Sequence, residues 1–365
     1  MKNKDTLNHP ILIIGAGLTG LTLAYYLKKK GIKYHVLEAR TRIGGRIFTD
    51  YQENGAPLEM GATWIGKKHQ EINKLLAELN LEIFEQTLGE RAIYEPISTS
   101  PPQLVSLPPN DEPSYRIKGG SSFLINTLAE NIGKDNISLN QIVTNISSTN
   151  SGLSVKTKTA EFQANLVVST LPPFLLTSTI EFQPSLPKKL KDITASTHTW
   201  MGESIKVGLC YATPFWRTEN SSGTIFSNVG PIPEMYDHAD AGDQFFSLKG
   251  FFNGAYFSIT KEERKEMVLN QLEKYYGSQV KNFINYEEGV WRNQPFTFAP
   301  YQQHVLPHQN NGHPIFSNPL MNDRFFLAGA ETATQYPGYM EGAVRSAQQV
   351  AKQISEKNPA IINPI

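Results

Sequence analysis

The sequence predicts an α/β protein built from two intertwined domains. Its 365 residues exceed what one hydrophobic core usually serves. An apolar strand near the amino terminus runs through a glycine-rich turn into a periodic apolar helix, and a strand, a turn and a helix also follow one another without a break from residue 325 to residue 351. Strands that pass directly into helices in this way favour an α/β fold.

Composition and charge exclude several classes of partner. Lys and Arg together number 34, as do Asp and Glu, and no long basic run occurs, so nucleic acid is not an expected partner. The start, MKNKDTLNHP, has no apolar core, and no stretch reaches the roughly 18 uninterrupted apolar residues of a membrane span. The lone cysteine, Cys210, cannot form an internal disulfide and is expected in the core. We therefore expect a cytoplasmic protein with no membrane span.

The first chemical motif is the stretch ILIIGAGLTG, which leads into the helix that follows it. Its glycines have the spacing of a Rossmann opening: Gly15 permits the tight turn, Gly17 lets a pyrophosphate approach the backbone, and Gly20 lets helix pack closely on strand. The helix start then offers free N–H groups to phosphates. Glu38 ends the second strand, 18 residues after Gly20, and is placed to bind ribose hydroxyls, which disfavours NADP. The expected cofactor-binding residues here are Gly15, Ala16, Gly17, Leu18, Thr19, Gly20 and Glu38; the alternative is an α/β unit that binds no nucleotide.

The next segment, EARTRIGGRIFT, separates FAD from NAD, which share this opening. Three arginines, at 40, 42 and 46, surround a glycine pair, so backbone amides and a planar guanidinium could reach one pyrophosphate. The alternative is a solvated basic turn. The cofactor-binding residues expected from this segment are Ala39, Arg40, Gly44, Gly45 and Arg46.

From this segment on, the sequence resembles the flavin-containing amine oxidase family, which includes monoamine, polyamine and L-amino-acid oxidases and carries an R-x-G-G-R segment here. The resemblance recurs in MGATWIG (60–66), QIVTNI (141–146), LVVSTLPP (166–173) and LAGAETATQYPGYMEGAVRSA (327–347). It implies a Rossmann-type FAD-binding domain assembled from residues 1–75, 118–200 and 297–365, with an intertwined α+β substrate domain from residues 76–117 and 201–296. The charged helix pattern of 260–277 is expected to cover a sheet of that second domain.

The resemblance also implies further contacts to the cofactor. The turn at 60–66 matches one that contacts the flavin, Val143 would meet the adenine, and the helix that begins at Met340 would point its amides at the pyrimidine ring. The residues implied are Gly61, Ala62, Thr63, Trp64, Val143, Trp291, Gly329, Glu331 and Met340. Some members carry a cysteine that bonds covalently to FAD where this chain has Pro300, so we expect non-covalent FAD.

Three residues are the expected catalytic ones: Lys206, Tyr301 and Tyr339. With period-2 alternation, Lys206 shares a strand face with small residues, while Ile205 and Val207 face the other way. The strand alone favours a surface lysine, whereas in the family the matching lysine holds a water against flavin N5, and the resemblance therefore implies that role for Lys206. Tyr301 stands ten residues after Trp291, as in a family pattern, and with Tyr339 would form an aromatic cage for an amine. The alternative is that both tyrosines only pack.

The activity implied by the resemblance is oxidation of a small-molecule amine to an imine, with hydride transfer to flavin N5 and reoxidation by O₂ to give H₂O₂. A flavin desaturase or oxidoreductase of a non-amine substrate stays an alternative on the same scaffold, as does a flavin-bound scaffold protein without turnover. Trp64 stands in the segment where L-amino-acid oxidases carry a carboxylate-binding arginine, so an amino-acid substrate is not expected. The short 76–117 interval implies a simpler or more open cavity, and its proline-rich part, 96–113, is an extended loop that acts either as a lid or as a linker. No metal is expected, because the histidines at 304, 308 and 313 surround Pro307 without carboxylates nearby.

Overall fold

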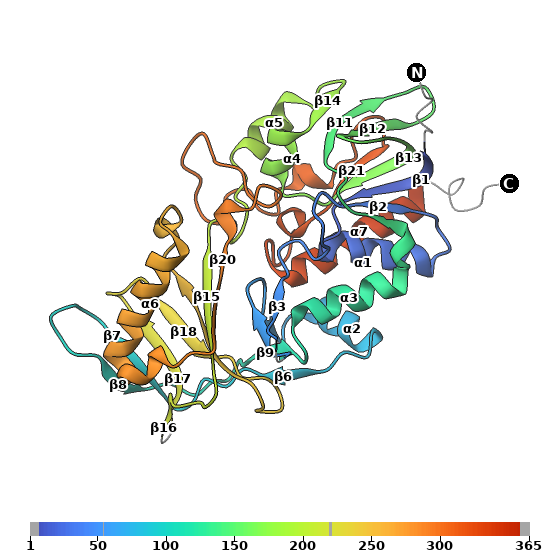
Figure 1. The fold of residues 1–365 in the computed structure, drawn as a ribbon. Helices are drawn as coiled ribbons and strands as arrows, with labels where there is room; N and C mark the ends of the chain where they lie inside the picture. The colour runs from blue at the N-terminus through green and yellow to red at the C-terminus, as the bar shows by residue number, and fades with distance from the viewer. Residues whose placement is uncertain (1–6, 54, 219–220, 358–365) are drawn as a thin grey trace.

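The computed structural model describes residues 7–53, 55–218 and 221–357. It consists of two lobes, each built on one large β-sheet (Figure 1), and in the described part of the chain both sheets have eight strands. The chain passes between the lobes several times, so neither lobe is one continuous segment. This is the predicted α/β architecture of two intertwined domains.

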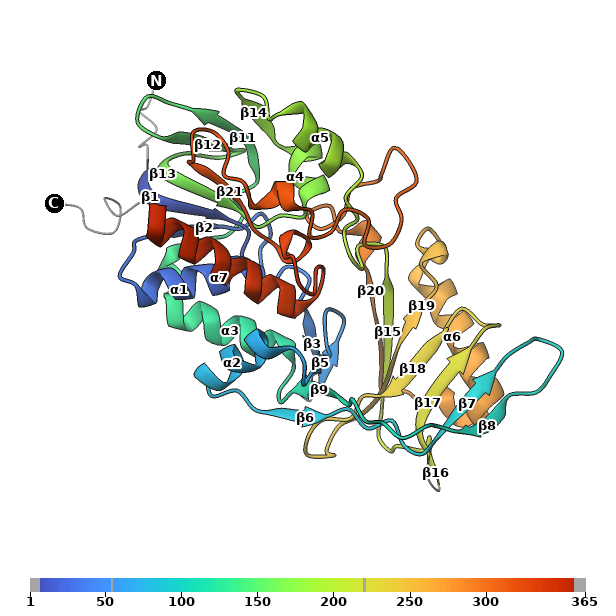
Figure 2. The ribbon, with the colours of Figure 1, turned by 180° about the vertical axis from the view of Figure 1, so that it is seen from behind.

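The first sheet is mostly parallel and carries helices on both faces. Its strands run in the order β10 (Ile137–Ser138), β2 (His35–Leu37), β1 (Leu7–Ile14), β13 (Glu161–Ser169), β12 (Leu153–Thr157), β11 (Val143–Ser148) and β14 (Glu181–Gln183), and β21 (Phe325–Leu327) pairs with β13. The helices α1 (Leu18–Lys29), α3 (Ser121–Ile132) and α7 (Met340–Lys357) lie side by side over one face (Figure 2). The other face carries α4 (Pro173–Thr179) and α5 (Lys188–Ala195).

Two apolar cores explain why β1 has a continuous apolar run. Ile11 and Ile13 pack with α1, α3 and α7, whereas Leu12 and Ile14 pack with α4, α5 and the β11–β12 hairpin. Successive side chains of a strand point to opposite faces, so a strand covered on both sides is apolar at every position.

The second sheet is mostly antiparallel. Its order is β20 (Asn285–Val290), β15 (Ile205–Tyr211), β19 (Phe246–Phe252), β18 (Glu234–Asp237), β17 (Ser221–Ser227), β7 (Arg91–Glu95) and β8 (Gln103–Ser106), with β16 (Arg217–Thr218) beside β17. The helix α6 (Lys261–Tyr276) packs Val268 and Leu272 on one face of it. This confirms the predicted helix, whose start is fixed by a capping box between Thr260 and Glu263.

Small elements join the two lobes. The hairpin β3 (Thr49–Tyr51) and β4 (Pro57–Glu59) lies between them, and β5 (Ile65–Gly66), β9 (Ser114–Ile117) and β6 (Ile83–Glu85) form a three-stranded sheet. Because β5 belongs to the predicted first domain and β6 and β9 to the second, the predicted boundary passes through this sheet. Helix α2 (Gln70–Glu78) packs on α7. Short 3₁₀ turns occupy 134–136, 254–256, 278–281, 291–293, 314–317 and 330–332.

The alternation predicted for residues 205–210 is present in β15. Ile205, Val207 and Leu209 pack against α6, and Lys206 and Cys210 point to the opposite face, where Cys210 contacts Leu58 and Met60 of the β4 segment. A Cβ on Gly208 would lie 2.7 Å from Leu58 Cδ1. The face that carries Lys206 is therefore the one that meets the first domain.

None of the described helices is long and apolar enough to cross a membrane. The proline-rich segment 96–113 contains β8, which pairs with β7 at the edge of the second sheet.

Candidate active site

A cavity of about 650 Å³ lies where the two domains meet. On one side it is lined by the carboxyl ends of β1, β2 and β13, which is where open α/β sheets bind their ligands. On the other side it is lined by residues of β15, β18 and β19 in the second sheet. No residue of 96–113 lines it, so the lining of the cavity does not support the lid alternative for this segment.

The glycine turns at 15–20 and 44–45 lie against each other at one end of the cavity. Gly15 has φ +103°, which favours glycine, and a Cβ on Gly20 would lie 2.0 Å from the Gly15 carbonyl oxygen. The amide of Gly44 donates to the Ala16 carbonyl (2.8 Å). Gly17 and Gly45 both line the cavity, so two stretches of bare backbone face a ligand there.

Glu38 is buried and holds the first turn in place. Its two carboxylate oxygens accept from the amides of Ala16 (2.8 Å) and Arg40 (2.9 Å). Each oxygen keeps a second lone pair, and Glu38 lines the cavity. A ribose hydroxyl could therefore donate to this carboxylate, which is the role predicted for it.

The three arginines of the predicted pyrophosphate segment have different positions. Arg40 lines the cavity and donates to Thr297 Oγ1 (2.7 Å), and Arg42 donates to the carbonyls of its own loop. Arg46 lines the cavity and forms a bidentate ion pair with Glu331 (2.5 and 2.8 Å). Burial disfavours the Arg46 charge, but the buried Glu331 carboxylate outweighs it and raises the pKa of Arg46.

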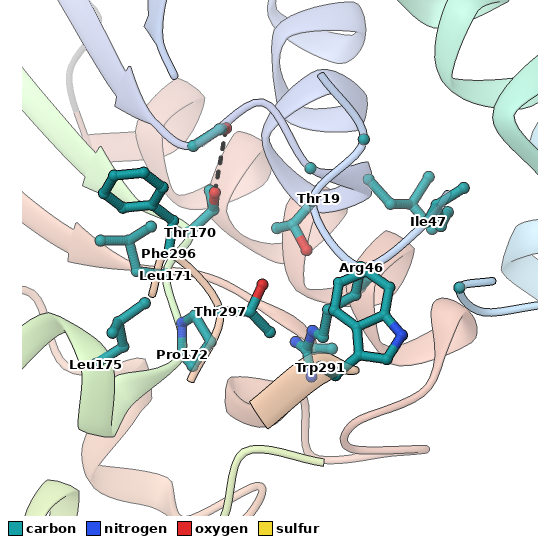
Figure 3. Close-up of a pocket in the computed structure, with 18 of the residues that line it drawn as sticks. Thr19, Arg46, Ile47, Thr170, Leu171, Pro172, Leu175, Trp291, Phe296 and Thr297 are labelled. Atoms are coloured by element: carbon teal, nitrogen blue, oxygen red, sulfur yellow. Dashed lines mark hydrogen bonds between the residues drawn. The ribbon is translucent and has the colours of Figure 1, made fainter. Parts of the chain in front are cut away.

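Two helices begin at the cavity. Helix α1 starts beside Gly17, which as a glycine offers no capping side chain, and Leu18 and Thr19 of its first turn line the cavity. Helix α7 starts at Met340, which also lines it. Unpaired amides and the positive end of the helix dipole suit an anionic or oxygen-rich ligand at each start. Figure 3 shows Thr19 and Thr297 on facing sides of this space.

Lys206 lies on the opposite wall, and only 5% of its surface is exposed. Its Nζ donates to the Gly61 carbonyl and to Thr63 Oγ1 (3.4 Å), and it lies 5.1 Å from the centre of the Phe251 ring and 5.9 Å from that of Trp64. Burial lowers the pKa of Lys206 to about 8. The side chain is therefore not a surface lysine, and near neutral pH its amine can gain or lose a proton at the cavity wall.

Aromatic rings gather at the mouth of the cavity. Tyr339 is 42% exposed and lies 5.7 Å from Trp200, which stacks on His308 at 3.8 Å. Tyr339 and Trp200 both line the cavity. Tyr301 does not line it: its ring contacts Phe174, His198 and Phe298, and its hydroxyl accepts from the Thr199 amide (2.7 Å). Beside Tyr339, the structure therefore places Trp200 where Tyr301 was expected.

Sequence comparison matches residues 18–96 and 97–355 to the family described as flavin containing amine oxidoreductase. The chain belongs to this family. It is 24% identical to a probable flavin-containing monoamine oxidase A of Dictyostelium discoideum, over 96% of this chain and 98% of that protein. It is 23% identical to the human flavin-containing amine oxidase B, over 94% of this chain and 85% of that protein.

Solved amine oxidase structures share the fold. A putrescine oxidase bound to putrescine superposes with a TM-score of 0.83 at 23% identity, covering 96% of this chain and all of that one. A cyclohexylamine oxidase from Brevibacterium oxydans IH-35A gives a TM-score of 0.81 at 20% identity, covering 96% and 99%. Membership of the family means that the protein is a flavin-dependent oxidoreductase.

The cavity fits a flavin cofactor. Bare glycine backbone, the start of α1 and the Glu38 carboxylate line one part of it, and a buried lysine, aromatic rings and the start of α7 line another. Most predicted cofactor-binding residues line the cavity; they are Gly15, Gly17, Leu18, Thr19, Glu38, Ala39, Arg40, Gly44, Gly45, Arg46, Gly61, Ala62, Thr63, Trp64, Val143, Trp291 and Met340. Individual contacts to the flavin stay predictions.

Four predicted cofactor-binding residues lie behind the wall, where they support it. Ala16 donates to Glu38, and Gly20 packs helix on strand. Gly329 donates to Ser346 Oγ (3.1 Å), and Glu331 accepts from Arg46 and from the Trp200 amide (3.1 Å). In the described ranges, no group of three or more His, Cys, Asp or Glu side chains could hold a metal ion.

The sequence did not predict several wall residues. Thr170, Leu171 and Pro172 follow β13 at the cavity, and the Thr170 hydroxyl donates to Ile14 O (2.9 Å) beside the first glycine turn (Figure 3). Their signal was the stretch LVVSTLPP (166–173), where the family resemblance recurs but no cofactor-binding residue was assigned. Glu234 and Phe251 on β18 and β19, and Phe296 and Thr297 in the loop after Trp291, also line the cavity. Their strands and loop carry no local motif that marks them.

Proposed function

We propose that the protein is an FAD-dependent amine oxidase, with FAD held non-covalently and a small-molecule amine bound between Lys206 and the Tyr339–Trp200 rings. When bound, the flavin would take a hydride at N5 from the carbon beside the amine nitrogen, giving an imine that hydrolyses, and would pass its electrons to O₂ to give H₂O₂. One observation carries this proposal: a cavity of about 650 Å³ is lined both by the two glycine turns and by a buried lysine on the face of β15 that meets the first domain.

The chain's own residues orient the amine and exclude water. Tyr339 and Trp200 offer ring faces that attract the partial positive charge on nitrogen. Lys206, held by Gly61 and Thr63, can hold a proton or a water at the end of the cavity. A substrate bound against this wall would already be oriented for reaction, which lowers the entropic part of the activation barrier.

The amine proposal is tested by mixing the yellow protein anaerobically with primary amines, polyamines and amino acids while following the visible flavin band. We expect one amine class to bleach the band quickly and air to restore it with release of peroxide. The rate should fall at low pH, because a protonated amine has no nitrogen lone pair to assist hydride departure. If dithionite bleaches the band but no amine does, the result would instead indicate a flavin oxidoreductase of a non-amine substrate.

Non-covalent binding is supported by the position of the only cysteine. Cys210 is buried beside Leu58 and Met60 and does not line the cavity, so no thiol lies on the cavity wall. We expect acid or denaturant to release all of the flavin as intact FAD, identified by chromatography and mass. Flavin that stays in the protein pellet would contradict non-covalent binding.

The charge of the wall favours amines with a second positive group. Two carboxylates line the cavity, and Glu38 serves the glycine turn, so Glu234 is the one left on the substrate side. It accepts from the Tyr236 hydroxyl (2.7 Å), beside Trp64 and Phe251. Glu234 could bind a distal ammonium and would repel a substrate carboxylate, so we propose diamines rather than amino acids. One structural neighbour is a putrescine oxidase bound to its diamine.

The variant Glu234→Gln tests this preference, because it keeps the side-chain shape and removes the charge. Hydrogen bonds to charged groups contribute about 1.5–3 kcal/mol, so we expect kcat/KM for diamines to fall by roughly 10- to 100-fold. Monoamines of equal length should be little affected. Glu203→Gln, whose carboxylate pairs with Arg292 and does not line the cavity, is the control. An equal loss for both substrate types would assign Glu234 a general structural role.

A further inference from the structure

A second lysine is buried directly behind Lys206. Lys249 of β19 pairs with Gly208 of β15, two residues along the strands from the pairing of Lys206 with Phe251, and none of its surface is exposed. It does not line the cavity. A lysine is almost never fully buried without a charge partner, yet among the described residues no carboxylate forms an ion pair with Lys249 or Lys206.

The two amines share one hydroxyl. Lys249 Nζ donates to Thr63 Oγ1 (2.6 Å), Lys206 Nζ donates to the same oxygen (3.4 Å), and Thr63 in turn donates to the Gly61 carbonyl (3.1 Å). A hydroxyl accepts two hydrogen bonds and donates one, so Thr63 is fully used. Lys249 Nζ also lies 4.3 Å from the centre of the Trp64 ring.

Counting donors and acceptors limits the charge that this pair can hold. An ammonium on Lys206 has three N–H groups, of which the Gly61 carbonyl and Thr63 Oγ1 accept two. The Lys249 nitrogen, which shares Thr63 Oγ1 with Lys206, is the neighbouring atom that could accept the third. The Lys249 nitrogen can accept only as a neutral amine, because an ammonium has no lone pair. Two ammonium groups would leave buried donors without partners and would repel each other. The site therefore suits one positive charge in total.

We propose that Lys249 is a positioning residue for Lys206. It is a neutral buried amine that supplies the third acceptor for the Lys206 ammonium, so that the two side chains together carry one positive charge at the cavity wall. The burial of Lys249 and the nearby charge of Lys206 lower the pKa of Lys249 well below its usual range, which agrees with a neutral amine. The inference rests on the proposed function only in assigning this wall to the flavin reaction.

Four other titratable groups surround the lysine pair. Glu59 on β4 is buried and accepts from Thr49 Oγ1 (3.0 Å) and from the Ser121 amide. Glu234 lies on β18, and Arg116 on β9 contacts His238 (3.0 Å), whose pKa burial lowers well below its usual range. The two glutamates favour a positive charge on the lysine pair, whereas Arg116 opposes one on Lys249. None of these groups replaces Lys249 as an acceptor for Lys206.

The test is a titration of the flavin-loaded protein labelled with ¹³C and ¹⁵N in lysine, in which the Cε and Nζ shifts report the charge of each amine. Lys206→Met and Lys249→Met each remove one signal and so assign both. In the wild-type protein we expect Lys249 to show the shift of a neutral amine at pH 7. In Lys249→Met we expect the Lys206 midpoint to fall by at least about one pH unit, a roughly tenfold loss of proton affinity.

Two further variants separate this role from simple packing. Lys249→Gln keeps an acceptor at this position, so the Lys206 midpoint should return toward the wild-type value, and exposed Lys189→Met should change neither signal. A wild-type Lys249 that is an ammonium at pH 7, or a Lys206 midpoint that is unchanged or raised in Lys249→Met, would overturn the proposal. The wild-type spectrum decides this even if Lys249→Met fails to fold, because Lys249→Gln can then assign the signal. No amine is added, so the result is independent of the amine proposal.

Discussion

Replacing Lys206 with methionine is expected to slow flavin turnover by about 100-fold or more while FAD stays bound. A positioned proton donor or acceptor typically contributes 10²–10⁴-fold, and Lys206 lines the cavity from β15 of the second sheet, on the strand face that meets the first domain. Methionine keeps most of the length of the side chain. Stopped-flow reduction by amine and reoxidation by O₂ measure the two half-reactions, and FAD content is read from absorbance.

The control for this variant is Lys261→Met, which changes an exposed lysine that pairs with Glu287 and does not line the cavity. It should leave both half-reactions unchanged. Turnover of Lys206→Met equal to the wild-type rate would remove Lys206 from the catalytic residues. Loss of FAD would instead make it a cofactor-binding residue.

The same variant has an effect on stability whose sign follows from burial. The pKa of Lys206 is lowered to about 8 in the folded protein against about 10.5 when unfolded, so the unfolded chain binds the proton more tightly. Protonation therefore favours unfolding below pH 8, and wild-type stability gains up to about 3 kcal/mol as pH rises from 8 to 10.5. Lys206→Met should lose this part of the gain in urea unfolding measured across the same range and should keep the part that the buried Lys249 amine contributes. Parallel curves for the two proteins would contradict the depressed pKa.

Replacing Glu331 with alanine is expected to lower the free energy of unfolding by about 3 kcal/mol and to weaken retention of FAD. Glu331 is fully buried and accepts from Arg46 twice and from the Trp200 amide. Removing one partner of a buried pair costs about 3–5 kcal/mol, and the low end applies because the Arg46 side chain is 24% exposed. Urea unfolding and FAD content of the purified protein measure the two effects.

A double variant separates the ion pair from the packing of Glu331. Arg46→Met combined with Glu331→Ala removes both charges, so it should be less destabilised than the sum of the single variants. Glu82→Gln, in an exposed pair with Lys118, should show no measurable change. Additive losses would mean that the Arg46–Glu331 pair contributes little and that Glu331 acts mainly through the Trp200 amide.

The parts of the site that sequence predicts are those that obey local rules. The glycines at 15 and 20 are required by a positive φ and by a close backbone approach, and Glu38 lies a fixed distance along the same βαβ unit. Period-2 alternation places Lys206 opposite Ile205 and Val207. Each of these features depends only on residues close to it in the sequence, so a single sequence is enough to predict it.

Other parts depend on contacts between distant segments. Arg46 and Glu331 are 285 residues apart, and Lys249 reaches Thr63 across 186 residues. Lys249 lies in the stretch FSLKGFF, whose alternation is typical of a strand with a solvent-facing lysine. Only the packing of β4 and the 60–64 turn on the second sheet buries it. Local propensity carries no signal for such a contact.

The sequence by itself determined the α/β class, the dinucleotide-binding turn and the strand that carries Lys206, because periodicity and glycine geometry act over a few residues. Only the tertiary structure decided which rings stand beside Tyr339, which carboxylate faces the substrate side of the cavity and which second amine lies behind Lys206. Those relations depend on how the two domains close on each other, and the free energy of that closure comes from apolar surface buried between segments far apart in the chain.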